Sequence, residues 1–408
     1  MWMKSFWRKS RSIVFYGILR LFQRDRQKVI EQMRPLRVLV VDDTAVYRKI
    51  VSEVLGELPD VEVVGLAHNG RIAMSKIAAL KPDLLTLDIE MPEMSGLEVL
   101  SRIKKEAPEV GAVMLSTLTR QGGELTMKAL ELGAFDFIPK PDEGNIDKNR
   151  EVVTKAMVPI LNAFVRRREI KAILNHKVEH SVCKQKNKTL KSPSVSKTAA
   201  VNRRRLRMKS EIIGIGVSTG GPGALALMLP RIPADLGVPI LIIQHMPPVF
   251  TQSLAKSLNA KCSIKVREGM DGEPLQSNTA LIAPGGKQMK VVAGADGLTR
   301  ILRVTDDPPE NSCRPSVDYL FRSIAHHYVG RATGVIMTGM GSDGTLGLKL
   351  MKRNGSIIIA QDEATSTVFG MPKEAIAAGV VDVVAPLENI ADEICQTVRP
   401  KGAERMLA

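Results

Sequence analysis

Apolar residues form a first block of repeating pattern in the N-terminal third of the chain, where short apolar runs alternate with segments of helical spacing. The apolar runs cover residues 37–43, 61–67, 83–89, 111–117 and 134–141. A continuous run of this length is typical of a strand buried on both faces, and apolar residues three or four positions apart are typical of a helix. Five such repeats predict a flavodoxin-like (βα)5 domain with a parallel sheet over residues 35–145.

A second block with the same alternation occupies residues 210–400. Strand-like runs fall at 211–217, 238–246, 279–285, 332–340, 355–362 and 379–386. Segments with helical spacing, such as 251–259, 316–327 and 344–354, lie between many of them. The pattern predicts a C-terminal doubly wound parallel-sheet α/β domain, so the fold class is α/β in both halves.

Two further segments lack this alternation. Helical spacing continues from about Ile146 to Ile173, and the rest of 146–209 is polar, basic and poor in large apolar residues, which predicts a helix followed by a linker. The leader, 1–34, contains one apolar run, but Arg20 ends it well short of the roughly 20 residues of a membrane span. We expect a flexible leader, with an amphipathic surface anchor as the alternative, no transmembrane segment and a cytoplasmic protein.

Charge and cysteine usage limit the partners. The net charge is +15, but residues 1–34 carry +7 and residues 166–209 carry +13, so the two predicted domains are mildly acidic. Aromatic residues make up only 4% of the chain, and 211–395 has no helix-turn-helix pattern, which argues against a DNA-binding regulator and predicts no specific nucleic-acid partner. The four cysteines are far apart, which indicates neither a zinc site nor a disulfide framework and fits a reducing cytosol.

Carboxylates follow two strands of the first predicted domain. Asp42 and Asp43 end the first strand and Asp88 ends the third, while Ser116 and Lys140 end the fourth and fifth. Carboxyl ends of parallel strands share one edge, and three carboxylates at that edge suit Mg²⁺, which binds few protein oxygens and can bridge to a phosphate. An acid after a strand can simply cap the next helix, which would explain Asp43 alone, but five matching positions favour a site that forms an aspartyl phosphate.

At this point a resemblance is clear. The stretches VLVVDDTAVYRK, LLTLDIEMPEMSGLEVL, VMLSTLT and GAFDFIPKP resemble the response-regulator receiver domain over 37–145. The resemblance implies that a histidine kinase is the phosphodonor and that Asp88 is the phosphoacceptor. It assigns Mg²⁺ binding to Asp42, Asp43, Asp88 and the backbone carbonyl of Glu90. It also implies that Ser116 and Phe137 report phosphorylation and that Lys140 contacts the phosphoryl group.

A glycine-rich stretch in the second domain, GIGVSTGGPGA at 214–224, allows two interpretations. It fits G-x-S-x-G, which presents a serine, here Ser218, on a tight turn after a strand. It is also a near miss to the dinucleotide fingerprint G-x-G-x-x-G, with Gly220 one residue late. The stretch alone does not decide between a nucleophile and a nucleotide-binding module.

Two residues elsewhere favour the nucleophile. His245 ends one apolar strand and Asp343 follows another, so Ser218, His245 and Asp343 are all expected at the carboxyl edge of one sheet, as a catalytic triad would require. Separately, His245 could be a structural histidine and Asp343 a helix N-cap; His326 and His327 are interpreted as structural. Backbone N–H groups of the two neighbouring glycine-rich turns are candidates for oxyanion binding: Thr219, Gly220, Gly221, Met340 and Gly341.

A second resemblance sharpens the chemistry. The stretches IGVSTGGPGAL, IIQHMP, LIAPGGKQM, RPSVDYLF, VIMTGMGSDG and QDEATSTVFGMPKEAI are similar to the catalytic domain of the chemotaxis protein-glutamate methylesterases, the CheB family, across nearly all of 211–395. The family implies hydrolysis of glutamyl methyl esters, and deamidation of glutamines, on methyl-accepting chemotaxis receptors, with no cofactor for the esterase reaction. It also implies that the receiver covers the active site until Asp88 is phosphorylated. The leader and the long basic linker depart from the family, and a longer tether lowers the receiver's effective concentration at that site.

Overall fold

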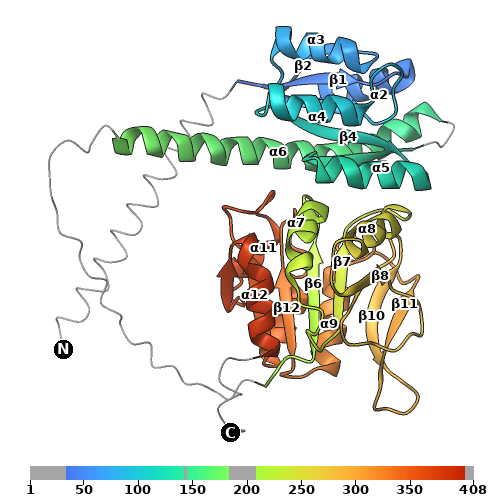
Figure 1. Cartoon of the computed structure of the whole chain (residues 1–408), viewed down its shortest axis with the longest axis vertical. Helices are drawn as coiled ribbons and strands as arrows, with labels where there is room; N and C mark the ends of the chain where they lie inside the picture. The colour runs from blue at the N-terminus through green and yellow to red at the C-terminus, as the bar shows by residue number, and fades with distance from the viewer. Residues whose placement is uncertain (1–33, 142–144, 183–207, 400–408) are drawn as a thin grey trace.

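The computed structural model describes residues 34–141, 145–182 and 208–399, with side chains omitted from 170 to 182. Two α/β domains stack on each other, and one long helix, α6, extends from the N-terminal domain (Figure 1). The predicted leader, apart from Arg34, and most of the predicted linker lie outside the described residues.

The N-terminal domain has the predicted five repeats. Its elements are β1 (Leu36–Val41), α2 (Ala45–Gly56), β2 (Val61–Ala67), α3 (Gly70–Leu80), β3 (Leu84–Asp88), α4 (Gly96–Glu106), β4 (Gly111–Thr117), α5 (Arg120–Glu131) and β5 (Asp136–Lys140). All pairs in its sheet are parallel, in the order β2-β1-β3-β4-β5. The strand order reverses between β1 and β3, which is where a doubly wound sheet opens a crevice at its carboxyl edge.

Local sequence signals position the elements around this crevice. Helix α4 begins with a capping box between Ser95 and Glu98, and Asn69 caps α3 through the Ile72 N–H. Gly96 lies so close to the end of β3 that a Cβ there would approach the Asp88 carbonyl oxygen to 2.0 Å. Only glycine allows this approach, so the start of α4 is held directly beside Asp88.

The C-terminal domain is the predicted doubly wound sheet. The elements that build its central sheet and its helices are β6 (Ile212–Val217), α7 (Gly221–Met228), η1 (Leu229–Arg231), β7 (Ile240–Gln244), α8 (Phe250–Asn259), β8 (Lys265–Glu268), β9 (Thr279–Ile282), α9 (Val317–His327), β12 (Ala332–Ile336), α10 (Thr345–Arg353), β13 (Ile357–Gln361), α11 (Met371–Ala377), β14 (Val383–Ala385) and α12 (Leu387–Val398). The seven strands described for this central sheet are all parallel, in the order β14-β13-β12-β6-β7-β9-β8. Its switch point lies between β6 and β12.

Three strands were not predicted. The strands β10 (Gln288–Ala293) and β11 (Arg300–Thr305) form an antiparallel hairpin that is separate from the parallel sheet. The third strand, β8, is an edge strand of the parallel sheet. Only Val266 of β8 is buried, so this strand has no apolar run, and no helix separates β10 from β11, so the hairpin does not form a β/α repeat. The predicted pattern of buried strands therefore could not detect them.

Helix α5 of the N-terminal domain packs on α7 and α8 of the C-terminal domain (Figure 1). Met127 of α5, together with Phe137 of β5, belongs to one continuous apolar core with Leu225 of α7 and Phe250 of α8. Ion pairs border this junction at Glu124–Lys256, 3.3 Å, and Glu131–Lys261, 2.6 Å. The domains are therefore joined through one apolar surface with a charged margin.

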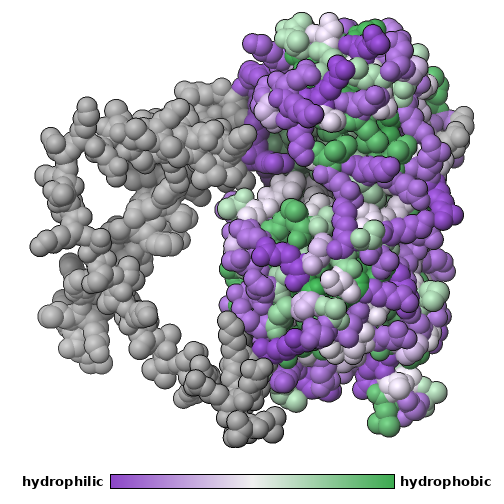
Figure 2. Space-filling view, in the orientation of Figure 1, coloured by the Kyte–Doolittle hydropathy of each residue, from purple (hydrophilic) through white to green (hydrophobic). Residues whose placement is uncertain are grey.

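Helix α6 (Ile146–Val182) starts against the N-terminal domain and ends nine residues beyond the predicted Ile173. Its first turns bury Val153, Met157 and Leu161 in the core that contains β1 and β5. None of the described helices is long and apolar enough to cross a membrane. The face in Figure 2 is mainly hydrophilic, with separate apolar patches, as the burial of the apolar strands predicts.

Candidate functional site

The acidic edge of the N-terminal sheet brings the predicted carboxylates together. Asp42 and Asp88 are buried while Asp43 is exposed, and one carboxylate oxygen from each lies within 4.8 Å of the others. Lys140 Nζ is 2.7 Å from Asp42 Oδ2 and 2.7 Å from Asp88 Oδ2. Four of the five predicted residues are therefore in one cluster that carries three acids and one ammonium.

The cluster has more acidic groups than basic ones, since it contains three carboxyl groups and one ammonium group. Burial raises the pKa of Asp88 to about 6, against the opposing effect of Lys140, and burial also raises the pKa of Asp42. A buried carboxylate with like-charged neighbours favours a bound cation, and hard oxygen ligands suit Mg²⁺. The residues present therefore fit the expected metal. The exposed Glu90 side chain points toward Thr117, at 3.5 Å, and its carbonyl as a ligand stays a prediction.

The two positions expected to report phosphorylation both connect to the domain junction. The Ser116 hydroxyl donates to the Gly122 carbonyl at 3.2 Å and accepts from Thr126 at 2.7 Å, so it is bound to α5. The Phe137 ring is buried against Phe250 of α8, with ring centroids 4.5 Å apart. Both residues thus contact elements that hold the C-terminal domain.

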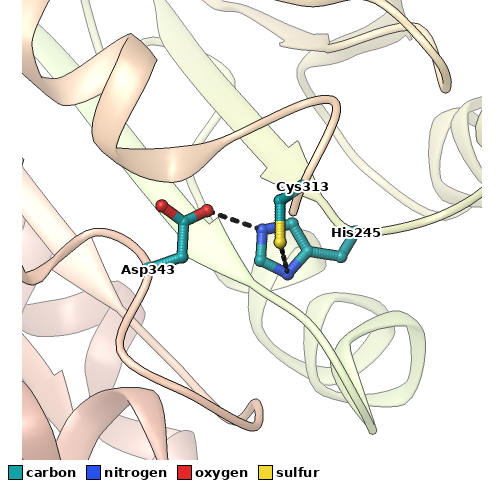
Figure 3. Close-up of side chains that lie close together, drawn as sticks. All are labelled: His245, Cys313 and Asp343. Atoms are coloured by element: carbon teal, nitrogen blue, oxygen red, sulfur yellow. Dashed lines mark hydrogen bonds and ion pairs between the residues drawn. The ribbon is translucent and has the colours of Figure 1, made fainter. Parts of the chain in front are cut away.

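At the carboxyl edge of the second sheet, His245 and Asp343 form a direct pair. His245 Nε2 is 2.8 Å from Asp343 Oδ2, across 98 residues of sequence (Figure 3). Asp343 is only 4% exposed and accepts further hydrogen bonds from the N–H groups of Val317 and Asp318 at the start of α9. The Asn311 amide and the Ser316 hydroxyl also donate to it, at 3.0 and 2.9 Å. Asp343 is therefore fixed in one orientation beneath the imidazole.

The contacts of Asp343 and His245 shift their pKa values in opposite directions. Burial tends to raise the pKa of Asp343, but the hydrogen bond and charge of His245 and the α9 N–H groups outweigh it and lower the pKa to about 2. Burial tends to lower the pKa of His245, but its bonds to Asp343 and Cys313 outweigh that effect and raise it to about 9. The contacts therefore favour a carboxylate paired with an imidazolium, the charge distribution that a triad reaches after its base takes a proton.

Ser218 lies beside His245 at the edge of the sheet. Val217 pairs with Gln244 in the parallel register, and the His245 N–H donates to the Val217 carbonyl at 3.2 Å, so the next residues, Ser218 and His245, are neighbours. The Ser218 backbone is held by Thr338. Within the described part of the chain, no hydrogen bond joins the Ser218 hydroxyl to the imidazole. His245 and Asp343 are thus hydrogen-bonded to each other, and Ser218 lies next to His245 without such a bond among the described residues.

Cys313 occupies the other side of the imidazole, and sequence analysis missed it. Its Sγ is 3.9 Å from His245 Nδ1 (Figure 3). Cys313 precedes α9 by a few residues, on the same segment that supplies the donors to Asp343. Spacing to the other cysteines carries no signal of this contact, because the partner is a histidine 68 residues away.

Glycines let the surrounding turns approach Ser218. A Cβ at Gly339 would lie 2.7 Å from Ser218 Cβ, and Gly220 has φ of 73°, which favours glycine. The Gly221 N–H already donates to the Ser218 carbonyl at 2.8 Å, so this oxyanion candidate is occupied by the turn itself. Met340 is half-buried and Gly341 has φ of 88°. The glycines therefore make room at Ser218, as the sequence indicated.

The remaining oxyanion candidates face the other domain. Asp136 of β5 is buried and lies against the Thr219 hydroxyl and the Gly220 N–H, both of which act to lower its pKa. Burial, the largest effect, nevertheless raises the pKa of Asp136 to about 7. A carboxylate of the N-terminal domain is therefore in contact with the turn that carries Ser218.

The two folds and the two sites define a response regulator whose second domain is an α/β enzyme. Residues 38–149 match the family model of the response regulator receiver domain, and residues 213–394 match that of the CheB methylesterase. The chain belongs to the family of the protein-glutamate methylesterases/protein-glutamine glutaminases, or CheB proteins.

Relatives of that name match over nearly their whole length. The protein from Desulfotalea psychrophila is 53% identical over 90% of this chain and 100% of its own. That from Bacillus subtilis is 40% identical over 89% of this chain and 99% of its own. The crystal structure of the Thermotoga maritima CheB methylesterase catalytic domain is 36% identical, covering 46% of this chain and 99% of that chain, with a TM-score of 0.45.

Proposed function

We propose that this chain removes methyl esters from glutamyl residues, and deamidates glutamines, of methyl-accepting chemotaxis receptors under control of its receiver domain. The observation that carries the proposal is the hydrogen bond between His245 and Asp343 beside Ser218, in a chain of the methylesterase family. The reaction needs no cofactor. We expect it to take place in the cytoplasm, where the receptor helices are accessible.

Ser218 is the nucleophile in this proposal. Its hydroxyl attacks the γ-carbonyl of the substrate while His245 takes the proton at Nδ1, because Nε2 is engaged by Asp343. Asp343 holds the imidazole and stabilises its positive charge. The imidazolium then donates the proton to the leaving oxygen of the ester, which departs as methanol, or to the leaving nitrogen of a glutamine, which departs as ammonia. Water attacks the resulting acyl-enzyme with His245 again as base, which restores Ser218 and releases glutamate.

The oxyanion of the tetrahedral intermediate requires donors near Ser218. We assign this role to the turn 219–221 and to the turn with Met340 and Gly341, where glycines let a backbone N–H approach the substrate. Gly220 is the leading candidate of the first turn, because the Gly221 N–H is bound within the turn. The Gly220 N–H faces Asp136 when the domains are docked, so substrate access requires the receiver to move.

In the receiver, Asp88 is the proposed phosphoacceptor and a chemotaxis histidine kinase the phosphodonor. Asp42, Asp43, Asp88 and the Glu90 carbonyl would hold Mg²⁺, which neutralises charge on the phosphoryl group when bound. Lys140 would contact that group, since its ammonium already lies 2.7 Å from Asp88. This donor set provides oxygen ligands in a buried cluster of net negative charge, as the ion requires.

The domain junction supports a regulatory role for phosphorylation. Ser116 is bonded to α5, and Phe137 packs on Phe250. A phosphoryl group on Asp88 adds nearly two negative charges beside Ser116, so a new hydrogen bond to that hydroxyl would compete with its bonds to α5. Displacing α5 and Phe137 would loosen the surface that covers the Ser218 turn.

Replacing the nucleophile tests the proposal. We expect Ser218→Ala to lower methanol release from methylated receptor by roughly 10⁴-fold or more, because the covalent route is lost. The matched control is Ser277→Ala, an exposed serine far from the edge with His245. Both variants should melt like the parent and accept phosphate. Turnover by Ser218→Ala at a rate near that of the control would refute the mechanism.

A further inference from the structure

In the hydrolysis proposed above, Cys313 takes no part in proton transfer or bond formation, although its thiol contacts His245. Cys313 Sγ lies 3.9 Å from Nδ1, the imidazole nitrogen that Asp343 does not engage, and the thiol is half-buried at this edge of the sheet (Figure 3). Among the described residues, neither Cys262 nor Cys395 has a hydrogen bond to a histidine. The soft sulfur and the imidazole nitrogen therefore form a distinct pair within the site.

The imidazole is prepared as a metal ligand. Asp343 accepts the Nε2–H at 2.8 Å, which directs the remaining lone pair to Nδ1, toward the thiol. A histidine that binds a metal almost always donates its other N–H to a carboxylate or carbonyl, which fixes the ring and raises its basicity. Asp343 is held in turn by Ser316, Asn311 and the start of α9. This is the supporting arrangement that a zinc-bound histidine requires.

The separation of the two ligand atoms suits a metal between them. Zinc lies about 2.3 Å from a cysteine sulfur and about 2.0–2.1 Å from a histidine nitrogen, so a tetrahedral angle gives a sulfur–nitrogen distance of roughly 3.6 Å. The observed 3.9 Å requires only a few tenths of an ångström of side-chain movement. Ligand atoms of His245, Cys313 and Asp343 all lie within 4.8 Å of one another, although Asp343 is already engaged by its donors.

We propose that His245 Nδ1 and Cys313 Sγ form a Zn²⁺ site that inhibits the esterase. Water, or the Ser218 hydroxyl, would complete the four ligands of zinc. Thiolate and imidazole select zinc over Mg²⁺, so the receiver and this site take different ions. Binding converts the thiol into a metal thiolate and the imidazolium into a neutral imidazole, and it releases both protons, from Sγ and from Nδ1, to solvent. Metal binding itself does not depend on the proposed hydrolysis; only its inhibitory effect rests on that function.

Inhibition follows from shared use of one lone pair. The Nδ1 electrons that take the Ser218 proton are the electrons that bind the metal, so an imidazole bound to zinc cannot act as the base. Because protons compete for the same lone pair, metal affinity should rise with pH. His245 therefore cannot bind zinc and accept the Ser218 proton at the same time.

Cobalt provides a direct readout, because thiolate-bound Co²⁺ absorbs through sulfur-to-metal charge transfer. The full-length chain, saturated with Mg²⁺, is titrated with Co²⁺ as parent, Cys313→Ser, Cys313→Ala, Cys262→Ser and Cys395→Ser. We expect the band in the parent and in the Cys262 and Cys395 variants, its loss in both Cys313 variants, and displacement by Zn²⁺. A band that survives in both Cys313 variants, or is absent from the parent, overturns the site.

Activity measurements connect the site to catalysis. Zn²⁺ should inhibit methanol release by the parent, with recovery after chelation, and Cys313→Ser should need at least tenfold more Zn²⁺ for half-inhibition, each variant being compared with its own metal-free rate. Equal sensitivity of the two chains refutes inhibition through Cys313. Ser218→Ala separates the two proposals: it should be inactive and keep the cobalt band, whereas an active Ser218→Ala chain would refute the hydrolytic mechanism and leave the metal site standing.

Discussion

Phe137 of the receiver sheet packs its ring against Phe250 of the esterase domain, with centroids 4.5 Å apart and ring planes inclined by 39°. Phe137 lies on β5, three residues before the Lys140 that contacts Asp88, and Phe250 begins α8, five residues after His245. One aromatic contact therefore lies between the acidic edge of one domain and the proposed catalytic edge of the other.

Removing this ring contact should raise activity before phosphorylation. An aromatic pair contributes about 1 kcal/mol beyond its buried area, so Phe137→Leu should weaken docking and increase basal methanol release by about fivefold. The matched control is Phe164→Leu, which removes the Phe135–Phe164 pair within the receiver and away from α8. Unchanged basal activity in Phe137→Leu, or an equal increase in the control, would show that this contact does not restrain the enzyme.

Asp88→Asn should separate basal from stimulated activity. The amide cannot accept a phosphoryl group, so we expect low basal esterase activity that a small phosphodonor with Mg²⁺ no longer increases. Asp60→Asn, which changes an exposed aspartate of the same domain, should keep full stimulation. Stimulation of Asp88→Asn to the parental level would place the phosphoacceptor elsewhere.

The pH dependence of the reaction should report the contacts of His245. Asp343 and Cys313 raise the pKa of His245 to about 9, so the imidazolium predominates at pH 7, and kcat/KM should increase with pH toward that value. Cys313→Ser removes one of the contacts that favour the imidazolium, so the midpoint should move to lower pH. The measurement is a pH profile of receptor demethylation for both chains. A midpoint that stays in place or rises would contradict this account.

Asp343→Asn should lower kcat and should also shift the midpoint of the pH profile of kcat/KM. The amide removes the negative charge that stabilises the imidazolium and allows the wrong tautomer, so we expect kcat to fall by roughly 10³–10⁴-fold with the fold retained. Asp382→Asn, a control in the same domain that faces β13 and Lys352, tests for a general loss of stability. A loss of activity that merely follows a lowered melting temperature in both variants would assign Asp343 a structural role.

The close approach at Ser218 gives a steric prediction. A methyl group at Gly339 would meet Ser218 Cβ at 2.7 Å and the Met371 sulfur at 2.4 Å, so Gly339→Ala should displace the nucleophile and cost about 1–3 kcal/mol of stability. At Gly223 of α7 a Cβ meets nothing within 4 Å, so Gly223→Ala should keep activity and add about 0.4–1 kcal/mol. Thermal melts and esterase rates of the pair check both statements. Parental activity in Gly339→Ala would show that the approach is not required.

Sequence patterns predicted the two sheets because buried parallel strands are continuous apolar runs, and they predicted Asp42, Asp88 and Lys140 as neighbours because each ends a strand at one edge. The same rule brought His245 and Asp343 together. It could not detect Cys313, which lies in a loop before α9, since loop positions carry no register. Asp136 was also missed, because its partners Thr219 and Gly220 belong to another domain. The hairpin β10–β11 was missed because it lies outside the β/α repeat.

In the docked state, Asp136 places a carboxyl group of the receiver where the product carboxylate would lie. In the proposed reaction, hydrolysis of a glutamyl ester leaves a carboxylate next to the turn of Ser218. In the docked domains the carboxyl group of Asp136 lies against Thr219 and Gly220 of the same turn. The closed protein thus resembles an enzyme that holds its own product, supplied by its own chain. When the domains separate, Asp136 leaves the Ser218 turn, as a product carboxylate would leave it after hydrolysis.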